Sequence, residues 1–214
     1  MRIKTLDYDP ANVDANGICE DQTPAAGGVQ ALSLDGALIS GGTFTDSTNM
    51  ARQLLMTTSA ADQGKNLVIT GTDADDNPET ETIALPNATT GETVKYFKTI
   101  SSITVSADTI GTVAVGTVDE VLGKIYPLNH RSPYGAHISV DVTGTANFTI
   151  EETYDDLQLP GYPVDALWTD ATAAGAIDVL DTMGVGATAF RVKVNSYTDT
   201  AEMQITVTQP GEFS

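Results

Sequence analysis

Four short runs of apolar and β-branched residues, separated by turn-forming residues, lie between Leu67 and Gly116. β-Branched side chains favour strands, and the Asp, Asn, Gly and Pro residues between the runs favour turns. The stretch contains no Cys, no His and no cluster of possible nucleophiles. It therefore predicts a scaffold of β-strands that carries no catalytic chemistry of its own.

The first two runs predict a β-hairpin. Leu67–Gly71 is followed by Thr72–Pro78, whose side chains can bond to their own backbone in a turn. Glu79–Leu85 then alternates between two faces, as a returning strand does. The preceding segment Arg52–Thr58 could begin a helix, but its Thr-rich end favours a strand that leads to Leu67.

The third run changes its alternation partway along. Val94, Tyr96, Lys98 and Ile100 share one parity, whereas Ile103 and Val105 share the other. Side chains on one face of a strand are two residues apart, so a change of parity interrupts that face. The slip predicts a β-bulge or bend at Ser101–Ser102.

Alternation is clearest in the second half of the chain. A hairpin with one solvent-exposed face is predicted by two alternating runs on either side of Gly144, Ile138–Val142 and Ala146–Ile150. Phe190–Val194 and Met203–Val207 alternate in the same way and predict a second hairpin. Between them lies a long Pro- and Ala-rich excursion, Asp155–Thr182, and the part from Ala171 to Met183 is compatible with a short helix or a surface loop.

These patterns predict an all-β fold with two consecutive β-sandwich-like or jelly-roll-like halves. Thr117–Pro133 has weak periodicity and marks the crossing between residues 29–120 and residues 121–214. Met1–Gly28 has no sustained periodicity, so we expect an extended N-terminal arm that becomes ordered on a neighbouring subunit. Asp35–Gly36 is the strongest two-residue hairpin signal in the chain.

The charge balance argues against several kinds of partner. With 29 acidic and 10 basic residues, the chain carries a formal net charge of −19. Nucleic acids and anionic membrane surfaces require concentrated Lys and Arg, so neither is expected as a partner. No apolar run is long enough to cross a membrane as a helix. Solubility explains the acidity most simply.

The sequence offers one weak candidate for a metal site, at the tip of the first hairpin. The candidate Ca²⁺ ligands are Asp73, Asp75, Asp76 and Asn77. Their loop lacks the sixth-position Gly and the final Glu of an EF-hand, and an acidic hairpin tip is more often a solvated turn. His130 and His137 are too few and too isolated for a His-based site.

No catalytic constellation is found in the sequence. It contains no nucleophile elbow, no phosphate-binding glycine loop and no paired-carboxylate motif, and Asp155–Asp156 is only a short acidic pair. Cys19 cannot form an internal disulfide and has no cationic neighbours in the sequence, so we expect it to be passive. The expectation is a protein that is not an enzyme and needs no cofactor.

Candidates for subunit contacts come from the predicted arm and from the excursion. They are Tyr8, Pro10, Ile18, Tyr162, Leu167 and Trp168. Large aromatic anchors dominate buried contact patches, which favours Trp168 as an anchor. An equally good interpretation makes Trp168 a plug over the open end of a sandwich.

The order of the β motifs resembles a pattern found in structural proteins of tailed-bacteriophage virions. In the first half the resemblance rests on Ile69–Asp75, Glu79–Pro86, Phe97–Val105 and Val113–Gly116. In the second half it rests on Val142–Asp156, Trp168, Ala189–Val194 and Gln204–Gln209. The match covers most of residues 22–210. Asn77–Pro78 departs from the pattern, in which Asn or Gly leads directly into the strand.

The resemblance implies a non-enzymatic virion component, most like a capsid decoration, or cement, protein on the exterior of a phage head. Its partners would be the major capsid protein and further copies of itself, with a trimer preferred. A neck or tail component is one alternative, and a carbohydrate-binding β-sandwich module is another. The second alternative would use the aromatic residues of the excursion, Tyr154, Tyr162 and Trp168.

Overall fold

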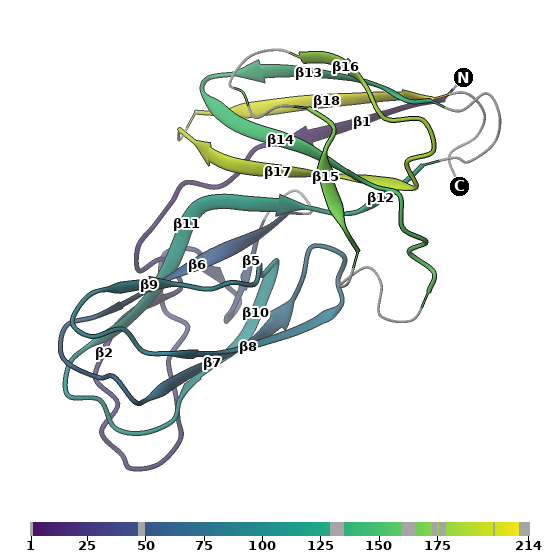
Figure 1. The fold of residues 1–214 in the computed structure, drawn as a ribbon. Helices are drawn as coiled ribbons and strands as arrows, with labels where there is room; N and C mark the ends of the chain where they lie inside the picture. The colour runs from purple at the N-terminus through teal and green to yellow at the C-terminus, as the bar shows by residue number, and fades with distance from the viewer. Residues whose placement is uncertain are drawn as a thin grey trace. The chain divides into compact units, whose positions relative to one another are not determined.

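The computed structural model describes residues 2–46, 50–128, 135–159, 166–172, 175, 179–198 and 200–209. These residues form β-strands and connecting loops, with no helix among them, which confirms the predicted all-β class. The chain divides into two compact units, whose strands are labelled in Figure 1. Unit 1 contains Met1–Pro10 and Leu122–Ser214, and unit 2 contains Ala11–Val121.

Unit 2 is built from two β-sheets. Its strands are β2 (Cys19–Gln22), β3 (Gln30–Ala31), β4 (Ile39–Ser40), β5 (Thr43–Thr45), β6 (Met50–Thr58), β7 (Asn66–Thr72), β8 (Pro78–Ala84), β9 (Thr90–Glu92), β10 (Thr99–Val105) and β11 (Val113–Gly123). One sheet has the order β4-β5-β10-β7-β8, with β3 also paired to β10. The other places β6 between β11 and β9, and β2 pairs with β11. The last two residues of β11 belong to unit 1.

The core of unit 2 combines apolar side chains from both of its sheets. Leu54 of β6, Ile69 of β7 and Ile103 of β10 are fully buried in the same cluster. Burying one such aliphatic side chain contributes about 1.5–3 kcal/mol. The cluster contains Ile18, Cys19, Leu32, Phe44, Leu54, Met56, Leu67, Ile69, Leu85, Phe97, Ile100, Ile103, Val105, Val113 and Val115. Unit 2 is therefore a β-sandwich with one continuous core.

The predictions around β7 are confirmed. β7 pairs antiparallel with β8 over its whole length, Asn66–Thr72 against Pro78–Ala84, as the predicted hairpin requires. The pairing of β10 with β7 shifts between Ile100 and Ser102, where the alternation of the sequence slips. The segment Arg52–Thr58 lies within the strand β6, as its Thr-rich end indicated.

Asp35–Gly36 does not connect a hairpin, which corrects the expectation from the sequence. The short strands on either side have other partners, because β3 pairs with β10 and β4 pairs with β5. The Asp35 carboxylate accepts a hydrogen bond from the Glu20 N–H, and the Gly36 N–H donates to the Ile18 carbonyl oxygen. A Cβ on Gly36 would lie 2.2 Å from the Gly17 carbonyl carbon. The Asp-Gly pair therefore allows two chain segments to approach closely.

Unit 1 also contains two antiparallel sheets. Its strands are β1 (Arg2–Tyr8), β12 (Tyr126–Pro127), β13 (His137–Thr143), β14 (Ala146–Thr153), β15 (Trp168–Asp170), β16 (Val179–Thr182), β17 (Ala189–Tyr197) and β18 (Glu202–Gln209). One sheet has the order β1-β18-β13-β16, and the other contains β15-β14-β17, with β12 paired to β17 (Figure 1). Fully or almost fully buried residues of both sheets supply its core: Ile138, Val140, Phe148, Ile150, Val192, Val194, Ile205 and Val207.

The two hairpins predicted for the second half are not formed. β13 pairs with β18 and β14 pairs with β17, so each pair of consecutive strands is divided between the two sheets. Gly144 and the segment before β18 make adjoining corners, and the Thr198 N–H donates to the Thr145 carbonyl oxygen at 2.9 Å. At Gly144 φ is +79°, a conformation that favours glycine. The β13–β18 pair thus lies in one sheet and the β14–β17 pair in the other, which is the arrangement of a jelly roll.

The first residues of the chain are not a free arm, which corrects a second expectation. β1 pairs with β18 from Arg2 opposite Gln209 to Tyr8 opposite Met203. Exposure alternates along β1, but charged and polar residues at many of its positions obscure the apolar pattern that marks a strand. Further along, Ile18 is buried in the core of unit 2. The boundary between the two units lies after residue 121, and the first ten residues belong to the same unit as residues 122–214.

Candidate interaction surfaces

The acidic hairpin tip between β7 and β8 is held together by its own hydrogen bonds. One oxygen of the Asp73 carboxylate accepts from the N–H groups of Asp75 and Asn77, both at 2.9 Å. Its other oxygen accepts from the Asn77 side-chain amide at 3.1 Å. The Asp76 carboxylate pairs with Lys98 at 2.6 Å. The tip therefore has the geometry of an Asx-type turn, in which Asp73 faces the backbone of the turn.

No cluster of three or more His, Cys, Asp or Glu side chains suited to a metal ion occurs among the residues that the structure describes. His137 lies on β13 with an exposed side chain, and His130 is outside the described residues. Within the described segments there is likewise no helix long and apolar enough to span a membrane.

The contact candidates from the expected arm are buried within the chain itself. Tyr8 is 2% exposed, Ile18 is fully buried and Pro10 is also buried. Their side chains pack inside the two units, so they do not present a surface to another subunit. Tyr8 lies on β1, whose pairing with β18 joins residues from opposite ends of the chain, so its burial leaves no local signal in the sequence.

The contact candidates from the excursion have a different environment. Leu167 is 73% exposed, and the neighbouring Trp168 is partly buried at the start of β15. The Arg191 guanidinium lies 4.2 Å from the centre of the Trp168 ring and pairs with Glu151 at 2.5 Å. Trp168 is thus engaged by a cation–π contact within unit 1. Tyr162 is outside the described residues.

Large apolar side chains that the sequence analysis did not single out are exposed in both units. In unit 1 these include Leu180 (82%) and Val185 (76%), and in unit 2 they include Val94 (78%), Ile110 (74%) and Val29 (72%). Their flanking residues are mixed in polarity, so the sequence gives no signal that they are exposed. Single exposed apolar residues are common on protein surfaces, and it is a contiguous apolar patch that marks an interaction site.

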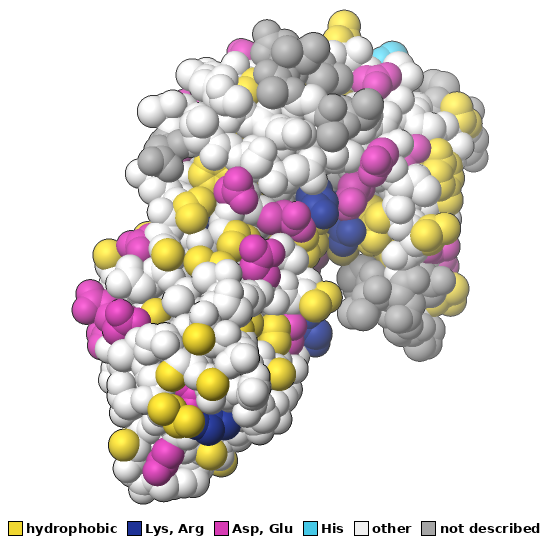
Figure 2. All heavy atoms as spheres, turned by 60° about the vertical axis from the view of Figure 1, so that its left-hand side comes forward, with side chains coloured by type: hydrophobic (Ala, Val, Ile, Leu, Met, Phe, Trp, Pro, Cys, Tyr) yellow, Lys and Arg dark blue, Asp and Glu magenta, His cyan; other side chains and the backbone are white. Residues whose placement is uncertain are grey.

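Acidic side chains dominate the charged surface. Figure 2 shows Asp and Glu scattered singly and in small groups, with few Lys and Arg among them, as the ratio of 29 to 10 requires. A basic patch of the kind that tracks a phosphate backbone is absent from the face shown.

Cys19 is buried and unpaired. Burial, together with the nearby charge of Asp35, raises the pKa of its thiol to about 12. A thiol is a weak nucleophile until it loses its proton, so Cys19 is suited to packing in the core of unit 2 and not to catalysis.

Asp62 has an environment that its position in a turn does not reveal. Its side chain is fully buried, and it accepts hydrogen bonds from the N–H groups of Ile110 (2.7 Å) and Gly111 (3.1 Å) and from Lys65 (2.5 Å). Burial acts to raise the pKa of this carboxyl, but these hydrogen bonds outweigh it and hold the pKa below its usual value. Asp62 therefore fixes the loop that carries the exposed Ile110.

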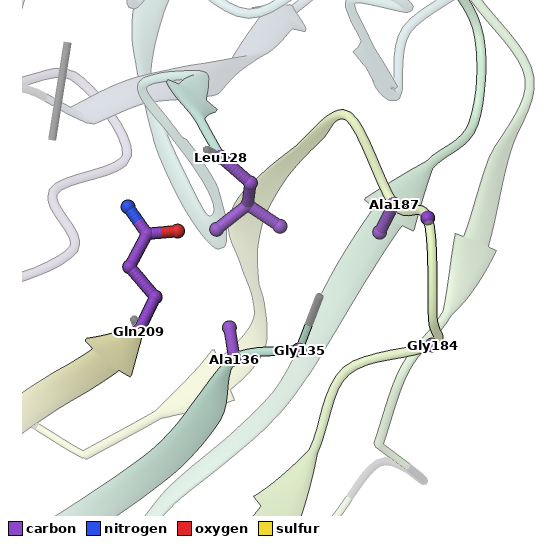
Figure 3. A pocket seen from close by; sticks show the side chains of 7 residues that line it. Leu128, Gly135, Ala136, Gly184, Ala187 and Gln209 are labelled. Atoms are coloured by element: carbon purple, nitrogen blue, oxygen red, sulfur yellow. The ribbon is translucent and has the colours of Figure 1, made fainter. Parts of the chain in front are cut away.

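Two cavities of unit 1 differ greatly in size. The smaller, seen in Figure 3, lies where the Gln209 amide and the Leu128 side chain approach Ala136, and its volume is about 10 Å³. That is about the space that one water molecule needs. The larger is an open groove of about 380 Å³ beside Tyr154. Of these two cavities, the groove is the one large enough for a small organic ligand.

No described protein family and no curated protein sequence matches the chain. The crystal structure of PBSX exported protein XepA is 12% identical, covers 95% of this chain and 86% of that chain, and has a TM-score of 0.25. The structure of the infectious bursal disease virus Gx strain is 9% identical over 100% of this chain and 72% of that chain, with a TM-score of 0.19. Vicilin from hazelnut, Corylus avellana, is 8% identical over 91% and 84%, with a TM-score of 0.20. TM-scores this low establish neither a shared fold nor a shared function.

Proposed function

We propose that the protein is a non-enzymatic structural component of a tailed-bacteriophage virion, and specifically a decoration, or cement, protein on the exterior of the head. In this role it contacts the major capsid protein and further copies of itself. The observation that carries the proposal is that each of the two β-sandwich units exposes large apolar side chains of its own. The order of β motifs that resembles virion proteins agrees with this role.

A bridging protein needs at least one contact surface for each subunit that it joins. Unit 1 offers Leu167, Leu180 and Val185, and unit 2 offers Val29, Val94 and Ile110, each more than 70% exposed. The loops that carry some of them are held by hydrogen bonds, as Asp62 holds the loop of Ile110. A pre-formed contact loses little conformational entropy on binding.

The charge of the protein suits the outside of a capsid. Packed DNA fills the interior of a phage head, and a net charge of −19 would be repelled by it. Cementing requires no chemistry, because many copies that each add a modest interface together stabilise a shell.

Self-association has a structural basis in the open sheet edges of unit 1. β1 and β16 are the outer strands of one of its sheets. Outer strands present unpaired backbone groups, which another copy of the chain can complete. Closed cyclic symmetry is the usual result of such contacts, and we propose a trimer. Sedimentation of the purified protein at micromolar concentration tests this, and a monomer that persists on the particle as isolated copies would contradict it.

Binding to capsids that lack the protein tests the proposed role. We expect the wild-type chain to bind, and Leu180→Glu in unit 1 and Ile110→Glu in unit 2 each to weaken binding by at least about tenfold, which is 1.4 kcal/mol. Thr145→Glu and Ser40→Glu add the same charge at exposed polar positions of the two units and serve as controls. Equal binding by all variants would contradict the proposal.

Deletion of Met1–Gly28 is not a suitable test of binding. It would remove β1 from its sheet and Ile18 and Cys19 from the core of unit 2, so the remaining chain would lose parts of both units. Single exposed substitutions avoid this difficulty because surface changes usually alter stability by less than about 0.5 kcal/mol.

A further inference from the structure

The larger groove of unit 1 has no part in the proposed bridging role. Its lining residues are Pro127, Tyr154, Asp156, Leu157, Gln158 and Thr188. They come from β12, from the loop after β14 and from the loop before β17. A volume of about 380 Å³ is within the range of small-molecule sites, about 300–1,000 Å³.

Thr188 holds the walls of the groove together. Its N–H donates to the Thr153 carbonyl oxygen at 2.7 Å, and its hydroxyl bonds to the carbonyl oxygens of Thr153 (3.0 Å) and Asp155 (2.6 Å). Its own carbonyl oxygen accepts from the Leu128 N–H at 2.8 Å. The three segments that line the groove are therefore joined by direct hydrogen bonds, and the groove is pre-formed.

Tyr154 supplies a fixed aromatic surface at the groove. Its side chain is 51% exposed, yet its hydroxyl donates to Glu152 at 2.8 Å, and Glu152 accepts from the Gly184 N–H at 2.9 Å. Glu152 is only 6% exposed, so this chain of bonds is anchored inside unit 1. The hydrogen bond to Glu152, together with burial, raises the pKa of the phenol, which keeps it protonated as the donor. The hydroxyl is therefore bonded to Glu152, and the exposed part of the ring remains available for stacking.

Polar groups with spare hydrogen-bonding capacity lie beside this ring. One Asp156 oxygen accepts from the Gln158 N–H at 3.0 Å, while the other oxygen and the Gln158 side-chain amide make no hydrogen bond to the described part of the chain. The groove thus combines an aromatic face with an acceptor and an amide that can both donate and accept. A pyranose ring has the complementary character, with C–H groups on its faces and hydroxyl groups around its edge.

We propose that this groove binds a neutral saccharide, with a pyranose ring stacked on Tyr154 and its hydroxyl groups bonded to Asp156 and Gln158. Anionic ligands are disfavoured because the Asp156 carboxylate lines the groove and the whole chain is strongly acidic. The inference is independent of the proposed virion role. A cell-surface or matrix glycan presents the required chemistry.

Saturation-transfer NMR on the full chain tests the proposal with methyl α-D-glucoside, methyl β-D-galactoside and N-acetylglucosamine as probes. We expect transfer to the ring C–H protons of at least one neutral pyranoside. Tyr154→Ala should weaken binding of that probe by at least about tenfold, whereas Tyr154→Phe, which keeps the ring, should retain it within about twofold. Leu180→Ala, an exposed change on β16, is the control and should leave binding unchanged.

Two further probes distinguish a neutral saccharide from other classes of ligand. Sialic acid, an anionic sugar, should bind more weakly than the neutral probes, and a Lys-rich peptide should not displace them. If Tyr154→Ala fails to fold, Gln158→Ala, at an exposed position, replaces it and should also weaken binding. No transfer from any neutral probe, transfer that survives loss of the Tyr154 ring, or preference for sialic acid or the peptide would overturn the proposal.

Discussion

The Arg52 guanidinium lies against the Asp46 carboxylate inside unit 2, and neither side chain is exposed to solvent (0% for each). Arg52 also donates to the carbonyl oxygen of Ala11, the first residue of the unit, while its backbone pairs with Phe97. Burial raises the pKa of the Asp46 carboxyl, and the charge of Arg52 acts in the opposite direction. One side chain thus connects β6 to the point where the chain enters unit 2.

Removing one partner of this pair should destabilise unit 2 strongly. Arg52→Ala leaves the Asp46 carboxylate buried without its counter-charge, and we expect a loss of about 3–5 kcal/mol in the free energy of unfolding. Urea denaturation measures this. Lys95→Ala, which breaks the partly exposed pair with Glu79, is the control and should cost no more than about 1 kcal/mol. Equal losses for the two variants would contradict this account of Arg52.

Asp62→Asn should also destabilise unit 2, by about 1–3 kcal/mol at pH 7. The amide lacks the charge that strengthens the bonds from Lys65 and from the N–H groups of Ile110 and Gly111. Asp108→Asn is the matched control, because this exposed carboxylate also accepts two hydrogen bonds, from Gly27 and Gln30. We expect Asp108→Asn to lower the free energy of unfolding by less than Asp62→Asn does.

The contribution of Asp62 should depend on pH. Its pKa in the folded state lies below its unfolded value of about 3.9, so the stabilisation is fully present above that pH. It is lost as the pH falls through the folded-state pKa, when the carboxylate becomes protonated. The difference in unfolding free energy between wild type and Asp62→Asn should therefore shrink below about pH 4. If this difference stays constant from pH 7 down to the lowest pH at which the protein folds, the proposed contribution of the Asp62 carboxylate is contradicted.

Gly71→Ala should destabilise the β7–β10 pairing, whereas Gly91→Ala should be tolerated. A Cβ on Gly71 would lie 1.8 Å from the Thr99 carbonyl oxygen, beside the bulge, so the backbone of β10 must move. A Cβ on Gly91 of β9 has its nearest neighbour at 3.4 Å. We expect a loss of about 1–3 kcal/mol for the first variant, as for other overpacked sites. Similar melting temperatures for the two variants would refute the steric argument.

Local features of the fold could be predicted from the sequence. The β7–β8 hairpin is encoded by a turn cluster between two alternating runs, and the bulge before Ser102 is visible because the parity of apolar residues changes there. Each of these depends on residues that are close in the chain. The strand alternation of β13, β14, β17 and β18 was equally clear.

Pairing between distant segments could not be predicted in the same way. Alternation shows that β13 and β14 are strands with one buried face, but it does not distinguish a hairpin from two strands that face each other across a sandwich. The pairing of Tyr8 with Met203 joins opposite ends of the chain. Likewise, the Tyr154 groove is formed by segments that only the tertiary structure brings together, and a buried Arg52 looks like an ordinary surface residue in the sequence.

Deletion of residues 1–7 tests whether the first residues of the chain are an integral strand of unit 1 or a free arm. Because β1 pairs with β18 over seven residues, we expect β18 amides to lose protection from hydrogen exchange and unit 1 to melt at a lower temperature. The amides of β7 and β10 in unit 2 serve as an internal control and should keep their protection. Unchanged protection of β18 would show that β1 is dispensable.

Imaging the virion tests the central claim most directly. A reconstruction of the particle by electron cryomicroscopy should show many copies of the two-unit chain at symmetry-related sites on the outer face of the head, each in contact with neighbouring major capsid subunits. Leu180 of unit 1 or Ile110 of unit 2 should lie in those contacts. A single ring of copies below the portal would assign the chain to the neck, and its absence from purified particles would contradict a structural role in the virion.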